Sequence, residues 1–170
     1  MSERLITQID LLVHPDYHLV DQFRPDLREK RSLRDKWDER VIQIAKQNTV
    51  LLYFQASMLN SRLGLWMGEN YQEIDQDRRK RYAEILGYNF FQFTTWEQPT
   101  SNKLAWMFRQ RNLRYNEKET NLFVYGEYLE LCVVTLQDYM ERTLGISKGR
   151  SHLIPELSLS NNREPRSNPV

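Results

Sequence analysis

The sequence predicts a single α/β domain of three layers, in which a mainly parallel sheet is flanked by helices. Short apolar runs alternate along the chain with segments whose apolar residues recur every three or four positions. Such alternation of strands and helices is typical of parallel sheets joined by right-handed crossovers. With 170 residues, the chain is long enough for one domain with a full core. We expect that domain over residues 1–159 and a disordered polar tail over residues 160–170.

Each predicted strand is a short apolar run, and most of the predicted helices carry an apolar stripe. In chain order we predict a strand over residues 5–13, a helix over 32–46, a strand over 49–54, a helix over 76–86, a strand over 88–93, a helix from 100 or 101, a strand over 122–125, a helix over 129–144 and a final strand within 152–159. Residues 58–76 have no sustained period and are predicted to form a short helix and a long loop.

Polar and special residues mark several element ends. Ser32 can cap the helix that follows it, as can either Thr100 or Ser101, and Gly145 suits the left-handed residue that ends a helix. Pro155 limits the last strand to an edge of the sheet, because proline cannot donate to a central ladder. The basic run over residues 78–81 is expected on an exposed face, because one helical turn spreads four consecutive residues around its circumference.

The composition argues against several classes of protein. The net charge is +1, from 24 basic and 23 acidic residues, so nothing favours a specific nucleic-acid partner or a membrane surface. A single cysteine cannot form an internal disulfide, and the first residues contain no secretory signal. No apolar run approaches the roughly 20 residues that span a bilayer. We therefore expect a cytoplasmic protein, and the sequence leaves open whether it forms a homo-oligomer.

Polar residues follow the predicted strands at the point where each one ends. The carboxyl ends of parallel strands meet at one edge of a sheet, where ligands usually bind. The candidates for catalysis at this edge are His14, Asp16, Glu127 and Cys132. The candidates for ligand binding are Tyr17, Gln55, Thr95, Trp96, Gly126 and Tyr128.

His14, Asp16 and His18 form the histidine–carboxylate cluster of the chain. In an extended segment all three would share one side, a geometry that permits metal binding, but no further ligand motif supports it. Turn formation is the favoured role, with a general base or ligand-orienting role for His14 or Asp16 as the alternative. The sequence contains no Walker loop, G-x-G-x-x-G motif or G-x-S-x-G elbow. We therefore predict neither a metal nor a cofactor.

Glu127 and Cys132 each have two interpretations. Glu127 follows a strand-end glycine, where it could exchange protons with a ligand or simply oppose the dipole of the next helix. Cys132 could be a packing residue on the inner face of that helix, or a nucleophile whose thiol is activated near the helix N-terminus.

The segment from Gly126 to Cys132 and Val133 resembles the isochorismatase-like cysteine hydrolases, in which a strand ends in glycine and Cys-Val follows six residues later at the start of a helix. The resemblance implies a three-layer α/β fold and hydrolysis of amides or vinyl ethers by an aspartate, a lysine and the cysteine. The chain departs from the family at Leu129, where threonine is usual. It has no lysine after the strand over residues 88–93, and Asp16 is displaced beyond His14 and Pro15.

Two functions therefore stay open. The first is binding or conversion of a small molecule, with Cys132 or Glu127 as the reactive group and His14 and Asp16 beside it. The second is a non-catalytic protein-interaction module, in which the aromatic segment over residues 58–76 forms the partner surface. The sequence does not decide whether the protein is an enzyme.

Overall fold

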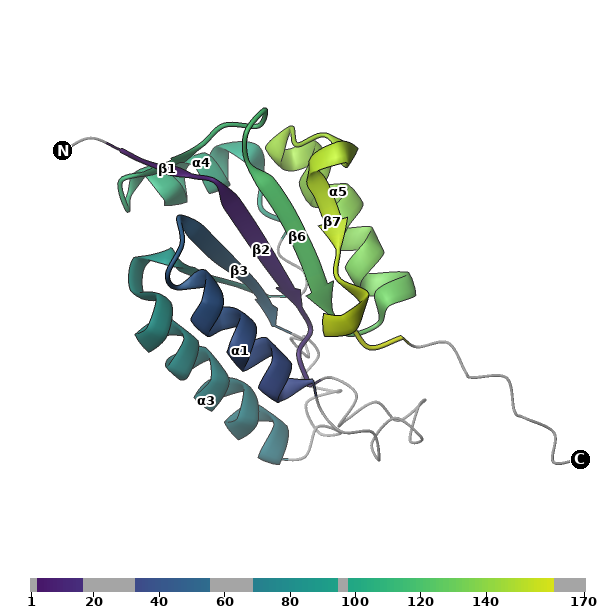
Figure 1. The fold of residues 1–170 in the computed structure, drawn as a ribbon. Coiled ribbons are helices and arrows are strands. Elements are labelled where there is room, and N and C mark those ends of the chain that lie inside the picture. Colours follow the sequence, from purple (N-terminus) through teal and green to yellow (C-terminus); the bar gives the residue numbers. More distant parts are fainter. Residues whose placement is uncertain (1–2, 17–32, 56–68, 95–97, 161–170) are drawn as a thin grey trace, which may run out of the picture.

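Five parallel strands form the central sheet of the computed structural model, which describes residues 3–16, 33–55, 69–94 and 98–160 (Figure 1). In chain order the strands are β2 (Gln8–Val13), β3 (Thr49–Gln55), β4 (Phe90–Thr94), β6 (Asn121–Gly126) and β7 (Ser151–Leu153). Their spatial order is β4-β3-β2-β6-β7, and every neighbouring pair is parallel. The chain moves outward from β2 to β4 and then returns to place β6 on the other side of β2. The prediction of a parallel α/β fold is confirmed.

Helices cover both faces of the sheet. One face is covered by α1 (Arg34–Ile44) and α3 (Glu69–Leu86), the other by α4 (Ser101–Arg109) and α5 (Val134–Leu144). Alternate residues of each strand point to opposite faces, so β2 contributes Leu12 to the first core and Leu11 to the second. Trp37 fills the centre of the first core, and Phe108 lies in the second. These two cores hold the sheet as the middle of three layers.

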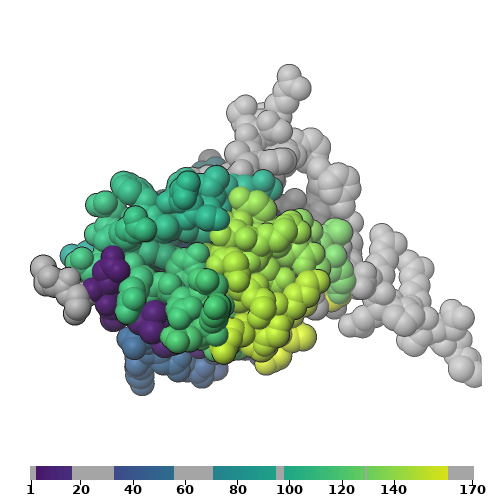
Figure 2. Space-filling view, turned by 90° about the horizontal axis from the view of Figure 1, so that it is seen from above, coloured from purple at the N-terminus to yellow at the C-terminus, as the bar shows by residue number. Residues whose placement is uncertain are grey.

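The first predicted strand is in fact two strands. β1 (Arg4–Ile6) pairs with the short strand β5 (Leu113–Tyr115), apart from the main sheet. Thr7, between the two strands, bonds to the main sheet: its N–H donates to Asn48 O at 3.0 Å, and its carbonyl accepts from Asn121 N at 3.0 Å. The small β1–β5 sheet lies near the amino ends of the main strands, the edge seen from above in Figure 2.

The helix predicted from residue 76 begins earlier, at Glu69. Its buried stripe consists of Tyr71, Asp75, Arg78, Tyr82 and Leu86, spaced four, three, four and four residues apart. Two members of that stripe, Asp75 and Arg78, are charged, so the spacing of apolar residues alone does not show the helical period. The expectation that residues 78–81 lie on an exposed face is wrong for Arg78, which is 2% exposed.

Several predicted boundaries are confirmed. The Thr100 hydroxyl caps α4 by accepting a hydrogen bond from Lys103 N at 3.2 Å. Gly145 ends α5 in the left-handed conformation, with φ 70°. The last strand, β7, lies at the sheet edge and ends before Pro155. Ser32 and the tail from residue 161 lie outside the described residues.

Within the ranges given above, no helix has both the length and the apolar character needed to cross a bilayer.

Candidate functional site

The carboxyl ends of β2 and β6 approach each other unusually closely. Gly126 pairs with Val13 and has a φ of 137°, and a Cβ added to it would lie 2.1 Å from the Val13 carbonyl oxygen. Only glycine fits this position, because any side chain would collide with the neighbouring backbone. Glu127 N then donates to Val13 O at 2.9 Å, so the contact continues past the end of the strand.

Strained backbone surrounds this contact. Of the four non-glycine residues with positive φ among those described, three lie here: His14, Asp16 and Tyr128, with left-handed φ of 48°, 65° and 59°; the fourth, Asn112, precedes β5. Each non-glycine residue in this region costs about 1–3 kcal/mol, and such residues cluster at functional sites. The chain order also reverses between β2 and β6, the position at which open α/β sheets bind ligands. Strain and topology therefore indicate the same place.

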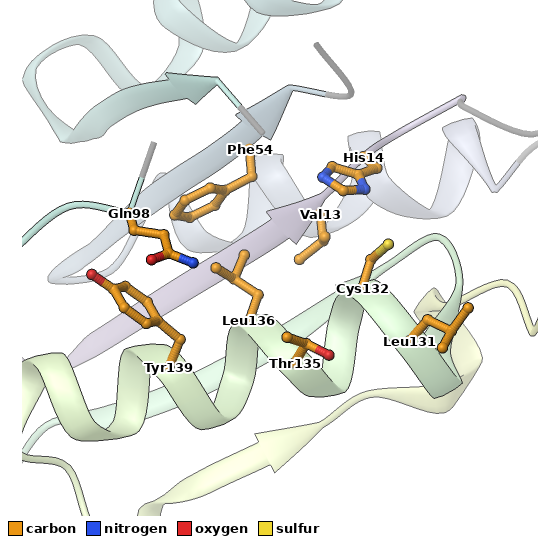
Figure 3. Close-up of a pocket in the computed structure, with 9 residues that line it drawn as sticks. All are labelled: Val13, His14, Phe54, Gln98, Leu131, Cys132, Thr135, Leu136 and Tyr139. Carbon is orange, nitrogen blue, oxygen red and sulfur yellow. The ribbon is translucent and has the colours of Figure 1, made fainter. Parts of the chain in front are cut away.

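A pocket of about 260 Å³ opens beside His14 (Figure 3). Residues from the ends of β2 and β3 line one wall, and the helical segment after β6 lines the opposite wall. Figure 3 shows the Cys132 sulfur and the His14 ring on facing walls. Among the residues that the structure describes, the lining consists of Val13, His14, Phe54, Gln98, Leu131, Cys132, Thr135, Leu136 and Tyr139.

A π-helical turn precedes α5 and carries Cys132. It spans Leu129–Val133, and its characteristic bond runs from Val133 N back five residues to Tyr128 O at 3.3 Å. Turns of this kind insert an extra residue into a helix and occur frequently at functional sites. Beyond this turn, Leu136 and Tyr139 continue the wall at helical spacing from Cys132.

The described lining of the pocket carries no formal charge at neutral pH. Burial lowers the pKa of His14 to about 4, so its imidazole is neutral. Burial also raises the pKa of the Cys132 thiol above its ordinary value, so the thiol keeps its proton. None of the nine lining residues is lysine, arginine, aspartate or glutamate.

Asp16 and Glu127 belong to a separate buried cluster. Both side chains are fully buried, and Asp16 forms an ion pair with Arg78 of α3. Burial raises the pKa of the Tyr71 hydroxyl, and the nearby carboxylates of Asp75, Glu127 and Asp16 raise it further. The sequence grouped four candidate catalytic residues at one edge. The structure places His14 and Cys132 in the pocket, and Asp16 and Glu127 around Tyr71.

Asp75 joins this buried cluster to β3. Its carboxylate accepts hydrogen bonds from the Tyr53 hydroxyl at 2.6 Å, Gln55 Nε2 at 2.8 Å and Arg79 Nε at 2.7 Å. Gln55, a predicted ligand-binding residue, therefore has a structural partner on α3. The surrounding bonds satisfy the Asp75 carboxylate well, which favours a structural role for it.

The other predicted ligand-binding residues have different outcomes. Gly126 and Tyr128 shape the backbone at the end of β6, and neither lines the pocket. Tyr17, Thr95 and Trp96 lie outside the described residues, as does His18 of the histidine–carboxylate cluster. Across the described ranges, no group of three or more histidine, cysteine, aspartate or glutamate residues is arranged to hold a metal ion.

Sequence reasoning missed most of the pocket wall. Thr135, Leu136 and Tyr139 follow Cys132 at spacings of three, four and seven residues, a pattern that would have identified one helical face. Phe54 closes the wall from β3 and stacks on Phe93, with ring centroids 5.0 Å apart. Gln98 comes from the segment before α4 and carries no sequence signal that indicates this role.

A second hollow of about 620 Å³ lies between α1 and the edge of the sheet. Arg40 lines it, but its Nε and Nη2 donate to the buried Asp10 carboxylate at 2.8 and 3.2 Å. Lys36, Glu39 and Glu156 add charges of both signs to the lining. The hollow therefore shows no preference for a ligand of one charge.

Fold and site together define the class of this protein: a doubly wound α/β domain with a small pocket, uncharged over its described lining, where the strand order reverses. Comparisons with family models, curated proteins and solved structures found no match to this chain. The resemblance to isochorismatase-like hydrolases stays a prediction that depends on Gly126, Cys132 and Val133.

Proposed function

We propose that this protein binds a small, uncharged organic molecule in the pocket between β2, β3 and α5, without a covalent bond to Cys132. The observation that carries the proposal is a pocket beside strained strand ends, in which none of the described lining residues has a charged side chain. An ionic ligand would lose its hydration there without gaining a counter-charge, so an uncharged ligand is favoured.

The pocket volume limits the size of the ligand. About 260 Å³ lies just under the range of roughly 300–1,000 Å³ that is common for ligand sites, which suits one ring and about ten non-hydrogen atoms. At ~0.4 kcal/mol per atom, such a molecule would bind with about −4 kcal/mol, or a Kd near 1 mM. A natural ligand that reaches beyond the described lining would bind more tightly.

The distribution of polar groups suits a ring with one or two hydrogen-bonding atoms. Val13, Phe54 and Leu136 supply apolar surface. Neutral His14 has one nitrogen that donates and one that accepts, and Gln98 supplies an amide. The ligand would therefore stack on apolar side chains while its polar atoms contact the histidine and the amide.

Hydrolysis by Cys132 is the less favoured function. A nucleophilic cysteine reacts as its thiolate, and burial raises the pKa of this thiol. An imidazole with a pKa near 4 is also a poor acceptor for the thiol proton. Asp16, the nearest counterpart of the family's aspartate, is paired with Arg78 instead. These observations support binding over nucleophilic catalysis.

The interaction-module alternative has little support from the described residues. Tyr71, at the end of the aromatic segment, is 3% exposed and packs within the protein. Trp66 and Met67 lie outside the described residues.

A fragment screen tests the binding proposal. Neutral one-ring compounds, with matched carboxylates and amines, would be titrated while protein amide signals are recorded by NMR. The Thr135→Tyr variant places a ring at the pocket rim, and Asp138→Tyr adds the same ring to an exposed position on the same helix. We expect neutral fragments to bind wild type and Asp138→Tyr, and to bind Thr135→Tyr at least tenfold more weakly. Preference for the charged series, or equal binding by the two variants, would contradict the proposal.

Thiol labelling separates binding from catalysis. The rate at which a small neutral reagent labels Cys132 would be measured against pH. We expect the rate to rise half-maximally at or above the ordinary cysteine value of about 8.5. Rapid labelling with a midpoint well below that value would show an activated thiolate and would favour hydrolysis instead.

A further inference from the structure

The turn over residues 14–16 connects the pocket with the buried cluster on the opposite face of the sheet. His14 lines the pocket on the α5 side, whereas Asp16, two residues later, contacts α3. Both residues have left-handed backbone conformations, and Pro15 lies between them. Such a turn persists only where its surroundings hold it, because each left-handed residue favours relaxation to ordinary backbone.

Helix α3 supplies the contacts that hold this turn. Arg78 Nη2 donates to the Asp16 carboxylate, and the Tyr71 hydroxyl donates to the Pro15 carbonyl at 3.4 Å. On the strand side, His14 N donates to Phe54 O at 2.8 Å. The Arg78 bond is the charged one in this set, and both of its partners are buried.

Arg78 is itself fixed by its neighbours. Its guanidinium lies over the Trp37 ring at 5.2 Å, and Nη1 donates to the Tyr82 hydroxyl at 3.1 Å. Asp38 is 3.7 Å from the same nitrogen. Arg34 also approaches Asp16, but at 3.9 Å and with a side chain that is 40% exposed. Among the described residues, Arg78 is therefore the buried cation that contacts Asp16.

We infer that Arg78 is a positioning residue: by holding Asp16, it keeps the 14–16 turn left-handed and thereby sets the place of the His14 imidazole in the pocket across the sheet. The role in ligand recognition rests on the proposed function, but the placement of His14 does not. Lysine would be a poor substitute, because Arg78 contacts different partners through two nitrogens and packs its flat face on Trp37.

The titration of His14 tests this inference without any ligand. The imidazole signals would be followed by NMR against pH in wild type, in Arg78→Lys and in Arg78→Gln. The matched control is Arg79→Gln, which removes the neighbouring arginine and its bond to Asp75. We expect a midpoint near pH 4 in wild type and in Arg79→Gln. In both Arg78 variants the midpoint should move toward 6.5, because the turn relaxes and water reaches the ring.

A purely structural role for Arg78 gives a different result. In that case the Arg78 variants would lose thermal stability while the His14 midpoint stayed near 4, and the inference would be overturned. A wild-type midpoint near 6.5 would overturn it as well. Should Arg78→Gln not fold, the double variant Asp16→Asn, Arg78→Gln replaces the ion pair with two neutral side chains. We expect the raised midpoint there too, and an unchanged midpoint would count against the inference.

The fragment titrations distinguish this inference from the proposed function. If a fragment binds wild type, its Kd should rise about tenfold or more in Arg78→Gln and stay unchanged in Arg79→Gln. A shifted His14 midpoint without any fragment binding would support the positioning role and contradict the proposed function. Fragment binding with an unshifted His14 midpoint in the Arg78 variants would support the proposed function and contradict the positioning role.

Discussion

Replacement of Gly126 by alanine should be among the most destabilising single changes in this chain. The added Cβ would lie 2.1 Å from Val13 O, 2.7 Å from Val13 N and 2.8 Å from Val13 C, all of them backbone atoms of the central strand. The φ of 137° adds about 1–3 kcal/mol of strain for any residue with a side chain. Separating the strand ends would also weaken the bond from Glu127 N to Val13 O, worth about 1 kcal/mol. We expect Gly126→Ala to lower the free energy of unfolding by at least ~3 kcal/mol.

The other glycines provide graded controls. Gly149 has open space around its Cα and no positive φ, so Gly149→Ala should change stability by less than ~1 kcal/mol. Gly87 also has open space but a φ of 54°, so its alanine variant should lose about 1 kcal/mol. Urea unfolding followed by circular dichroism would measure all three. If Gly126→Ala lost no more stability than Gly87→Ala, the close contact between β2 and β6 would be disproved.

Three further predictions concern single side chains. His14 has a pKa of about 4 in the folded state and about 6.5 when unfolded, so the unfolded state gains a proton first as the pH falls. The free energy of unfolding should therefore decrease by roughly 1–3 kcal/mol as the pH is lowered from 6.5 to 4. Stability measured against pH should show this loss in wild type but not in His14→Gln, and parallel curves for the two proteins would refute it. Thr100→Ala should lower the free energy of unfolding by about 1 kcal/mol in a urea titration, because the cap of α4 is lost. Thr100→Ser keeps a hydroxyl at this position and should leave the stability unchanged. Asp10→Asn should cost roughly 3 kcal/mol in the same assay, because it leaves Arg40 without its buried carboxylate, and a loss below ~1 kcal/mol would count against that pairing.

The strand ends could be predicted because their sequence signals are local. An apolar run that stops at Gly126, followed by helical spacing, indicates both the strand and its reversal. The buried face of α3 gave no comparable signal, because Asp75 and Arg78 lie at positions where an apolar pattern expects aliphatic residues. The burial of Asp75 depends on partners in β3, and that of Arg78 on Asp16 beyond the end of β2, and no local pattern indicates either.

The sequence indicated the strand ends at which the pocket lies, but only two of the four candidate catalytic residues, His14 and Cys132, line it. His14 and Asp16 were placed in one site because both follow the carboxyl end of the same strand. The left-handed conformations at both residues direct them to opposite faces of the sheet. Backbone reversal at non-glycine residues depends on tertiary contacts, such as the bond from Arg78, so the separation of these two side chains could not be foreseen from sequence.

The location of a bound fragment tests the ligand site most directly. Backbone amide and methyl signals would be assigned and followed during titration with a neutral one-ring compound. The structure predicts that the largest shifts fall on Val13, His14, Cys132 and Leu136, with little change at Arg40 in the second hollow. Shifts centred on Arg40, or an absence of saturable shifts across the neutral series, would contradict a ligand site at the junction of β2 and β6.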